Sequence, residues 1–318
     1  MILFLCFLRR WSILSRRDKA LRQSWHMSSY VRLIGIILDI LLKVGSNVVT
    51  RVEDGKVALG RIGSLCEQVK ELVESGVEVI IVTSGAVGMG YRLLRHHRTL
   101  NTSFAELAKR ETQPDGKACA AVGQSGLITL YDTLFSLLDV ASSQLLVTSR
   151  DFRSMEFRSQ LVDTVNSLLD MQVVPIFNEN DAISTREDKC KDNGQFFWDN
   201  DSLAGLLASE VKADLLIFLM DVDGLYTRPP SQPDAKLIHT FVEEKHMKEV
   251  MYDEKPGSKG GMEEKVHIAQ RVAEDGVPVI ITSGFLPDAM KRILHGDEIG
   301  TLFHRDASRW QKAESNGY

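Results

Sequence analysis

The sequence predicts a three-layer α/β/α sandwich with a mainly parallel central sheet. Helical and strand patterns alternate along the chain from residue 41 onward, which is typical of α/β folds. The strand segments are short apolar runs such as VVPIF at 173–177, as expected for buried strands. Right-handed crossover connections between parallel strands would then place helices on both faces of the sheet.

The elements are expected in a regular order along a chain of 318 residues, of which 44% are hydrophobic and 25% charged. This composition is ordinary for a globular protein with a sizeable core. The predicted strands are 41–50, 77–83, 142–148, 173–177, 213–221 and 277–283. The predicted helices are 60–76, 123–138, 157–170, 201–211 and 262–276. A glycine turn should interrupt the first strand, and SGAVGMG at 84–90 should form a small-residue turn.

The chain divides into three predicted parts. Residues 41–310 form the main domain, 311–318 a C-terminal tail, and 1–40 an atypical extension that is disordered or comes from a misassigned gene start. The apolar runs near the N-terminus are shorter than the roughly 20 residues of a membrane-spanning helix. Within the main domain, 184–197 is expected to be a mobile flap. The proline-rich loop 226–236 should begin a small lobe that ends near residue 258.

Charge and cysteine content exclude several function classes. The formal net charge of −5 offers no general basic field, so no nucleic-acid partner is predicted. The four cysteines are far apart with no CxxC pair, which argues against a zinc site and a disulfide framework. We therefore predict small-molecule chemistry without a membrane partner, in the cytoplasm or alternatively in a plastid or mitochondrion.

Polar residues gather where four predicted strands end: KVGSN at 43–47, TSGAVG at 83–88, NEND at 178–181 and MDVDG at 220–224. In parallel sheets, ligands bind beyond the carboxyl ends of the strands. A purely structural interpretation is also available, because the glycines at 85, 88 and 90 could serve tight turns and NEND could be a capped turn. The strand ends alone leave both interpretations open.

Two further segments favour phosphate chemistry. WDNDSLAG at 198–205 opens a helix with more acidic residues than capping needs, and KPGSKGGMEEK at 255–265 is a glycine loop that leads into a helix. Backbone N–H groups of such a loop and the helix N-terminus suit phosphate oxygens. Lysines 43 and 265, with carboxylates at 181, 199 and 201, could neutralise and align a transferred phosphoryl group. The sequence motifs of P-loop enzymes, protein kinases and dinucleotide-binding proteins do not occur.

The order of eight strings resembles that of the glutamate 5-kinases of the amino acid kinase superfamily. The strings are LLKVGSNVVT, IIVTSGAVGMG, GQSGLITLYDTLF, VVPIFNENDAIS, FWDNDSLAGLLA, LLIFLMDVDGLYT, KGGMEEKV and IGTLFH. The resemblance covers about residues 41–310 and is closest to the kinase domain of eukaryotic bifunctional pyrroline-5-carboxylate synthases. It implies the amino acid kinase fold and ATP-dependent phosphorylation of the glutamate γ-carboxylate to glutamyl 5-phosphate, the first step of proline biosynthesis.

The resemblance also implies roles for individual residues. Catalysis would fall to Lys43 and Lys265, which neutralise the γ-phosphoryl group, and to Asp201, which orients them. Substrate would be bound by Ser84, Gly85, Ala86, Asn178, Asp181, Asp199 and Asn200. ATP would contact Lys43, Met220, Asp221, Lys259, Gly260, Gly261, Met262 and Lys265. Mg²⁺ would be held partly by the phosphates, with no dedicated protein metal site. Proline would act as a feedback inhibitor, and the chain would form a homo-oligomer.

The first strand departs from the family pattern. YVRLI at 30–34 matches the expected start, whereas GIILDIL at 35–41 is extra sequence before LKVGS. A slip of one residue would turn Lys43 to the other face of the sheet. This departure favours the alternative of a catalytically impaired regulatory subunit of a synthase. A kinase-domain fragment of a synthase and an amino acid kinase with a different acceptor are further alternatives.

Overall fold

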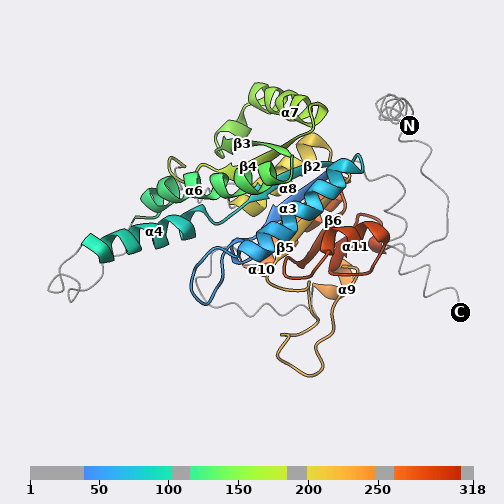
Figure 1. Cartoon of the computed structure of the whole chain (residues 1–318). Helices are drawn as coiled ribbons and strands as arrows, with labels where there is room; N and C mark the ends of the chain where they lie inside the picture. The colour runs from blue at the N-terminus through green and yellow to red at the C-terminus, as the bar shows by residue number, and fades with distance from the viewer. Residues whose placement is uncertain (1–38, 102–114, 185–198, 248–260, 309–318) are drawn as a thin grey trace, which may run out of the picture.

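A seven-stranded sheet with the order β3-β4-β2-β1-β5-β6-β7 forms the centre of the computed structural model, which describes residues 39–101, 115–184, 199–247 and 261–308 (Figure 1). All neighbouring strands are parallel except β6 and β7. The strands are β1 Asp39–Val44, β2 Glu78–Thr83, β3 Ala141–Val147, β4 Val173–Glu179, β5 Leu215–Met220, β6 Val279–Ser283 and β7 Thr301–Phe303. The predicted mainly parallel sheet is confirmed, and the antiparallel β7 was not predicted.

Helices cover both faces of this sheet. One face carries α3 Leu59–Glu74, α6 Gly116–Leu137 and α11 Ala289–His295, whose buried residues form the α3-side core. The other face carries α7 Met155–Asp170, α8 Asn200–Val211 and α10 Met262–Glu274, whose buried residues form the α8-side core. Figure 1 shows α3 crossing in front of the strands. The predicted three-layer sandwich is confirmed.

The first strand has the register that the site needs. The strand begins at Asp39 and ends at Val44, so part of the supposed extra sequence belongs to it. Ile40 and Leu42 lie in the α3-side core and Leu41 lies in the α8-side core. Because side chains alternate along a strand, Lys43 faces the same side as Leu41, toward α8 and α10. The one-residue slip considered above has not occurred.

Two local predictions were wrong. Residues 47–50 do not continue the first strand, because the one-turn helix α2 Ser46–Val49 follows Gly45. The run SGAVGMG is not one turn either. Gly85 has φ of +113°, which favours glycine, but α4 Ala86–Asn101 begins directly after it and contains Gly88 and Gly90.

The close contact between α4 and α6 explains why position 90 in α4 is glycine. A Cβ atom on Gly90 would lie 1.8 Å from the carbonyl oxygen of Cys119, and one on Gly123 would lie 1.8 Å from that of Ala86. Neither backbone oxygen can move without displacing its helix. The two helices therefore approach each other as closely as they do only because both positions lack a side chain.

Replacing Gly123 with alanine is expected to destabilise the fold by about 1–3 kcal/mol or more, the usual effect of overpacking. The matched control is Gly88→Ala in α4, where a Cβ atom would meet nothing within 4 Å. This control should be neutral or stabilising by up to about 1 kcal/mol, since alanine favours helix. Urea denaturation of both variants measures the difference, and equal effects would contradict the packing argument.

The predicted small lobe shares the core of the sheet where the structure describes it. Ile238 and Phe241 belong to the α8-side core, and Phe241 stacks on Phe303 of β7 with ring centroids 4.8 Å apart. The short helix α9 Glu243–His246 follows. The N-terminal extension before residue 39, the predicted flap beyond residue 184, and residues 248–260 and 309–318 lie outside the described residues. Among the helices that are described, none is long and apolar enough to cross a membrane.

Candidate active site

The candidate site lies at the carboxyl ends of the four adjacent strands β4, β2, β1 and β5. Parallel pairing brings these ends to one edge of the sheet. Two backbone hydrogen bonds tie the strand ends together: the amide of Ser84 donates to the carbonyl of Val44 over 3.1 Å, and the amide of Gly45 donates to the carbonyl of Leu219 over 2.9 Å. The functional side chains therefore start from a rigid edge.

Three charged residues from three elements meet on the α8 side of this edge. Asp201 forms ion pairs with Lys43 and with Lys265, whose Nζ lies 3.1 Å from Asp201 Oδ2. Lys43 comes from β1, whereas Asp201 and Lys265 come from the first turns of α8 and α10. All three are buried, with 5%, 4% and 8% of their surface exposed. The sequence-predicted catalytic residues are thus brought together, and we call them the Lys–Asp–Lys cluster.

The Lys–Asp–Lys cluster combines two ammonium groups with the carboxylate of Asp201. Burial alone would raise the pKa of Asp201, but the ammonium groups of Lys43 and Lys265 outweigh it and hold that pKa below its usual value. A second carboxylate, that of Asp199, lies close enough for the charges of Asp201 and Lys43 to affect its pKa. The N-termini of α8 and α10 add positive dipole ends nearby. This arrangement is suited to an anion such as a phosphoryl group.

Asp199 and Asn200 organise the start of α8. Asp199 is the N-cap, and its Oδ1 accepts hydrogen bonds from the amides of Asp201 (3.1 Å) and Ser202 (2.9 Å). Asn200 Oδ1 accepts from the amide of Glu179 over 2.9 Å, which joins α8 to the end of β4. Both were predicted to bind substrate. In the structure these oxygens already have protein partners that position Asp201.

The charge of Asp199 opposes folding. Burial, and then the nearby charge of Asp201, raise the pKa of Asp199. A raised pKa in the folded state means that stability falls as pH rises through the unfolded value of about 3.9 toward the folded value. Asp199→Asn keeps a side chain that caps equally well and removes the charge. We expect this variant to melt at a higher temperature at pH 7. The gain should vanish below about pH 4, where Asp199 is protonated in both states; a gain that persists there would contradict the argument.

The NEND run is the end of a strand and then a turn. Strand β4 extends through Asn178 and Glu179, two residues further than predicted. The amide of Ser184 then donates to the carbonyl of Asn180 over 2.8 Å, and its hydroxyl donates to Glu179 Oε1 over 2.6 Å. Asp181 lies within the turn that these bonds close. The hydrogen bonds confirm the structural interpretation, a capped turn, and the turn lies at the edge of the sheet where the binding interpretation places a ligand.

Asn178 contacts a residue that the sequence did not single out. Its side chain is 1% exposed, and its Nδ2 donates to Oε1 of Gln124 in α6. Its Oδ1 is buried without a hydrogen-bond partner among the described residues. A buried acceptor left in this state costs about 1–3 kcal/mol. Gln124 lies within one of the strings that carry the resemblance, but no local pattern indicates its contact, which spans 54 positions of sequence.

The residues predicted to bind ATP are only partly described. Met220 ends β5, Gly261 is the N-cap of α10 and Met262 is its first residue, while Lys259 and Gly260 lie outside the described residues. Asp221 accepts a hydrogen bond from Asn47 Nδ2 over 2.6 Å. That contact joins the ends of β1 and β5, and the sequence analysis did not predict it.

Ser84, Gly85 and Ala86 lie together where β2 leads into α4. Ser84 is buried. A Cβ atom on Gly85 would lie 3.1 Å from Cγ1 of Val49, so the absence of a side chain there lets the two loops approach. All three predicted substrate contacts are thus at the candidate edge.

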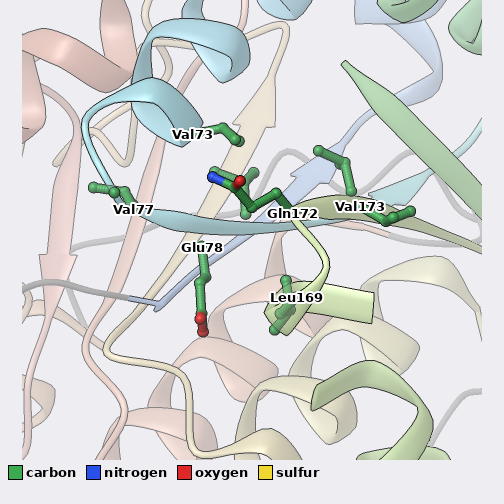
Figure 2. A pocket seen from close by; sticks show the side chains of 9 residues that line it. Val73, Val77, Glu78, Leu169, Gln172 and Val173 are labelled. Atoms are coloured by element: carbon green, nitrogen blue, oxygen red, sulfur yellow. The ribbon is translucent and has the colours of Figure 1, made fainter. Parts of the chain in front are cut away.

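A small pocket lies at the opposite edge of the sheet (Figure 2). Its lining includes Glu78 and Val173, which begin β2 and β4, and it has a volume of about 20 Å³. That volume holds about one water molecule. Because parallel sheets bind ligands at the carboxyl ends of their strands, this pocket is not the candidate site.

Within the described part of the chain, no group of three His, Cys, Asp or Glu residues is placed to hold a metal ion.

Comparisons with known proteins agree with this geometry. The model of the amino acid kinase family matches residues 40–283. "Delta-1-pyrroline-5-carboxylate synthase 1" of Oryza sativa subsp. japonica is 58% identical over 276 residues, which are 86% of this chain and 38% of that protein. "Glutamate 5-kinase" of Picosynechococcus sp. is 38% identical over 269 residues, covering 83% of this chain and 67% of that protein. The chain thus spans about two fifths of the length of the plant synthases that it matches.

Solved structures share the fold. Isopentenyl phosphate kinase is 19% identical with a TM-score of 0.55, and the match covers 83% of this chain and 99% of that one. UMP kinase from Bacillus anthracis has the same identity and TM-score, with 85% and 97% covered. At this identity the likeness concerns the arrangement of strands and helices alone.

Proposed function

Because the chain belongs to the amino acid kinase family, we propose that it transfers the γ-phosphoryl group of ATP to the side-chain carboxylate of glutamate. The product would be glutamyl 5-phosphate, at the first step of proline biosynthesis. The observation that carries this proposal is the buried Lys–Asp–Lys cluster at the carboxyl edge of the sheet. Similarity to the glutamate 5-kinase of Picosynechococcus sp. supports the choice of glutamate as acceptor.

The mechanism needs alignment and charge neutralisation more than proton transfer. A carboxylate acceptor is already ionised at neutral pH, so no general base is required. Lys43 and Lys265 would neutralise the charge on the phosphoryl group as it moves, and Asp201 would hold both ammonium groups in place before the substrates bind. Water has little access to this cluster, which strengthens each of these interactions.

The acceptor would lie beside the lysines at the same edge. Ser84 and the backbone of Gly85 and Ala86 would hold the reacting carboxylate, and Asn178 and Asp181 would bind the amino-acid end. Met220, Asp221 and the start of α10 would contact the nucleotide, with Lys259 and Gly260. Mg²⁺ would arrive with the nucleotide, held partly by the phosphate oxygens.

The impaired-subunit alternative has less support. It depended on a displaced Lys43, and Lys43 is paired with Asp201. Use of MgATP, feedback inhibition by proline, self-association and a location in the cytoplasm, a plastid or a mitochondrion stay predictions, as do the boundaries of the domain at 41 and 310.

Trapping the acyl phosphate tests the proposal. The purified chain is incubated with ATP, Mg²⁺, hydroxylamine and either glutamate or aspartate, and the hydroxamate is measured. We expect product with glutamate and little with aspartate, because the shorter side chain cannot reach the phosphoryl group from the same amino-acid contacts. Equal product with aspartate would indicate a different acceptor. No product from a chain that is folded by circular dichroism would overturn the proposed activity.

A further inference from the structure

In the structure, the amide of Asn178 directs its Nδ2 toward a residue outside the proposed substrate contacts. Asn178 follows Val174 and Ile176 on the side of β4 that faces the α3-side core, where α6 supplies Gln124 as the acceptor for its Nδ2. A carboxamide is planar and its oxygen and nitrogen point in different directions. Holding Nδ2 on Gln124 therefore also determines where Oδ1 lies.

Only a hydrogen-bond donor can satisfy the oxygen that remains. Oδ1 is buried with no partner in the described part of the chain, and Asn178 lies at the candidate edge, next to the turn that carries Asp181. Of the polar groups of glutamate at neutral pH, the two carboxylates only accept hydrogen bonds and the ammonium group only donates them. The unpartnered oxygen of Asn178 thus matches the ammonium group and disfavours a carboxylate.

We infer that Gln124 is a positioning residue that makes the site selective for the ammonium group of the amino-acid substrate, by holding the Asn178 amide with its carbonyl oxygen free for that group. This inference rests on the proposed function. With no acceptor at position 124, the amide can rotate and present Nδ2 instead, which would attract a carboxylate. Gln124 acts through Asn178 and is not itself assigned a contact with the reacting atoms.

The test compares glutamate with glutarate, the same diacid without the ammonium group. For each variant, the dissociation constants of both compounds are measured by calorimetry, and the kinetic constants by the hydroxamate assay. Gln124→Met removes the acceptor while keeping length and helix propensity. We expect this variant to raise the dissociation constant of glutamate about 10-fold or more, as for a lost charge-assisted hydrogen bond. Glutarate affinity, the KM for MgATP and kcat at saturating glutamate should change by less than about threefold.

Two further variants make the result specific. Gln124→Glu can only accept, so it should keep the orientation of Asn178 and preserve the preference for glutamate over glutarate. Asn178→Asp presents an acceptor oxygen whichever way its side chain rotates. Adding Gln124→Met to this variant should therefore change the preference for glutamate over glutarate little. The effects of the two substitutions on binding should thus be non-additive. Ser125→Ala, an exposed neighbour on α6, controls for effects on the helix.

The outcomes separate this inference from the proposed function. If Gln124→Met weakens the binding of glutamate and of glutarate equally, or weakens the binding of neither compound, Gln124 has a packing role and the inference is wrong. Loss of the preference in Gln124→Glu would also overturn it. If the unaltered chain binds glutamate but forms no hydroxamate, the proposed activity falls while the calorimetric comparison still decides the inference. Failure of the unaltered chain to bind glutamate overturns both.

Discussion

Replacing Lys265 with methionine is expected to lower kcat by about 10²–10³-fold, the usual effect of removing one group that stabilises charge in a transition state. Lys265 lies in the Lys–Asp–Lys cluster, 3.1 Å from Asp201 and 8% exposed. Its ammonium group would act mainly on the phosphoryl group in transit, so the KM for glutamate should change little. Steady-state kinetics with varied glutamate at saturating MgATP separates the two constants.

Folding should survive this change, because Asp201 keeps Lys43 as an ion-pair partner. Lys70→Met is a matched control: Lys70 pairs with Glu74 on the surface of α3 at 3.5 Å, and such exposed pairs contribute little. The control should retain activity. A loss of glutamate affinity in Lys265→Met as large as the loss of kcat would contradict its role on the transferred group.

Replacing Asp201 with asparagine is expected to lower the free energy of unfolding by roughly 3–5 kcal/mol and to abolish activity. Removing one partner of a buried ion pair leaves the other charge uncompensated, and here two lysines would face each other in a buried place. Urea denaturation at pH 7 measures the loss. Asp54→Asn, at an exposed carboxylate paired with Arg51, should have a far smaller effect.

The pH dependence of the free energy of unfolding is a second, independent test of the role of Asp201. Its folded pKa is lowered, by Lys43 and Lys265 acting against burial, so its contribution is present above the unfolded value of about 3.9 and is lost as pH falls through the folded value. The stability gap between the unaltered chain and Asp201→Asn should therefore narrow in acid. The double variant Asp201→Asn with Lys265→Met should regain stability, because the charge of Lys265 is removed and no longer repels that of Lys43. No recovery would show that charge is not the cause.

Much of the fold could be predicted from local sequence. Strands β2, β5 and β6 are continuous apolar runs, and α3 and α10 place apolar residues on one face, so period and length identify them. The predictions failed where distant contacts decide the structure. Gly88 and Gly90 looked like turn residues, yet they lie in α4, where the approach of α6 excludes a side chain at position 90. Strand β7 is three residues long and has too little pattern to be seen.

The candidate site, too, could be predicted from the sequence only in part. Lys43 and Lys265 could be named from a strand end and a glycine loop, the resemblance selected Asp201 among three candidate carboxylates, and the structure brings the three residues together. The resemblance names Asp199 and Asn200 for the substrate, which stays a prediction, and the structure adds a capping role for Asp199 and a bond from Asn200 to β4. Local sequence cannot separate these roles, because the same side-chain oxygen can accept from a substrate or from a backbone amide.

By itself, the sequence determined the order of most strands and helices, the sheet edge where polar residues collect, and the two lysines with three candidate carboxylates at 181, 199 and 201. These follow from residue type and spacing along the chain, which set hydrophobic period and turn chemistry. Only the tertiary structure decided the register of β1 that turns Lys43 toward Asp201, the glycine contact between α4 and α6, and the pairing of Asn178 with Gln124. Each of these depends on distances between segments far apart in sequence, and those distances are set when the two cores pack against the sheet.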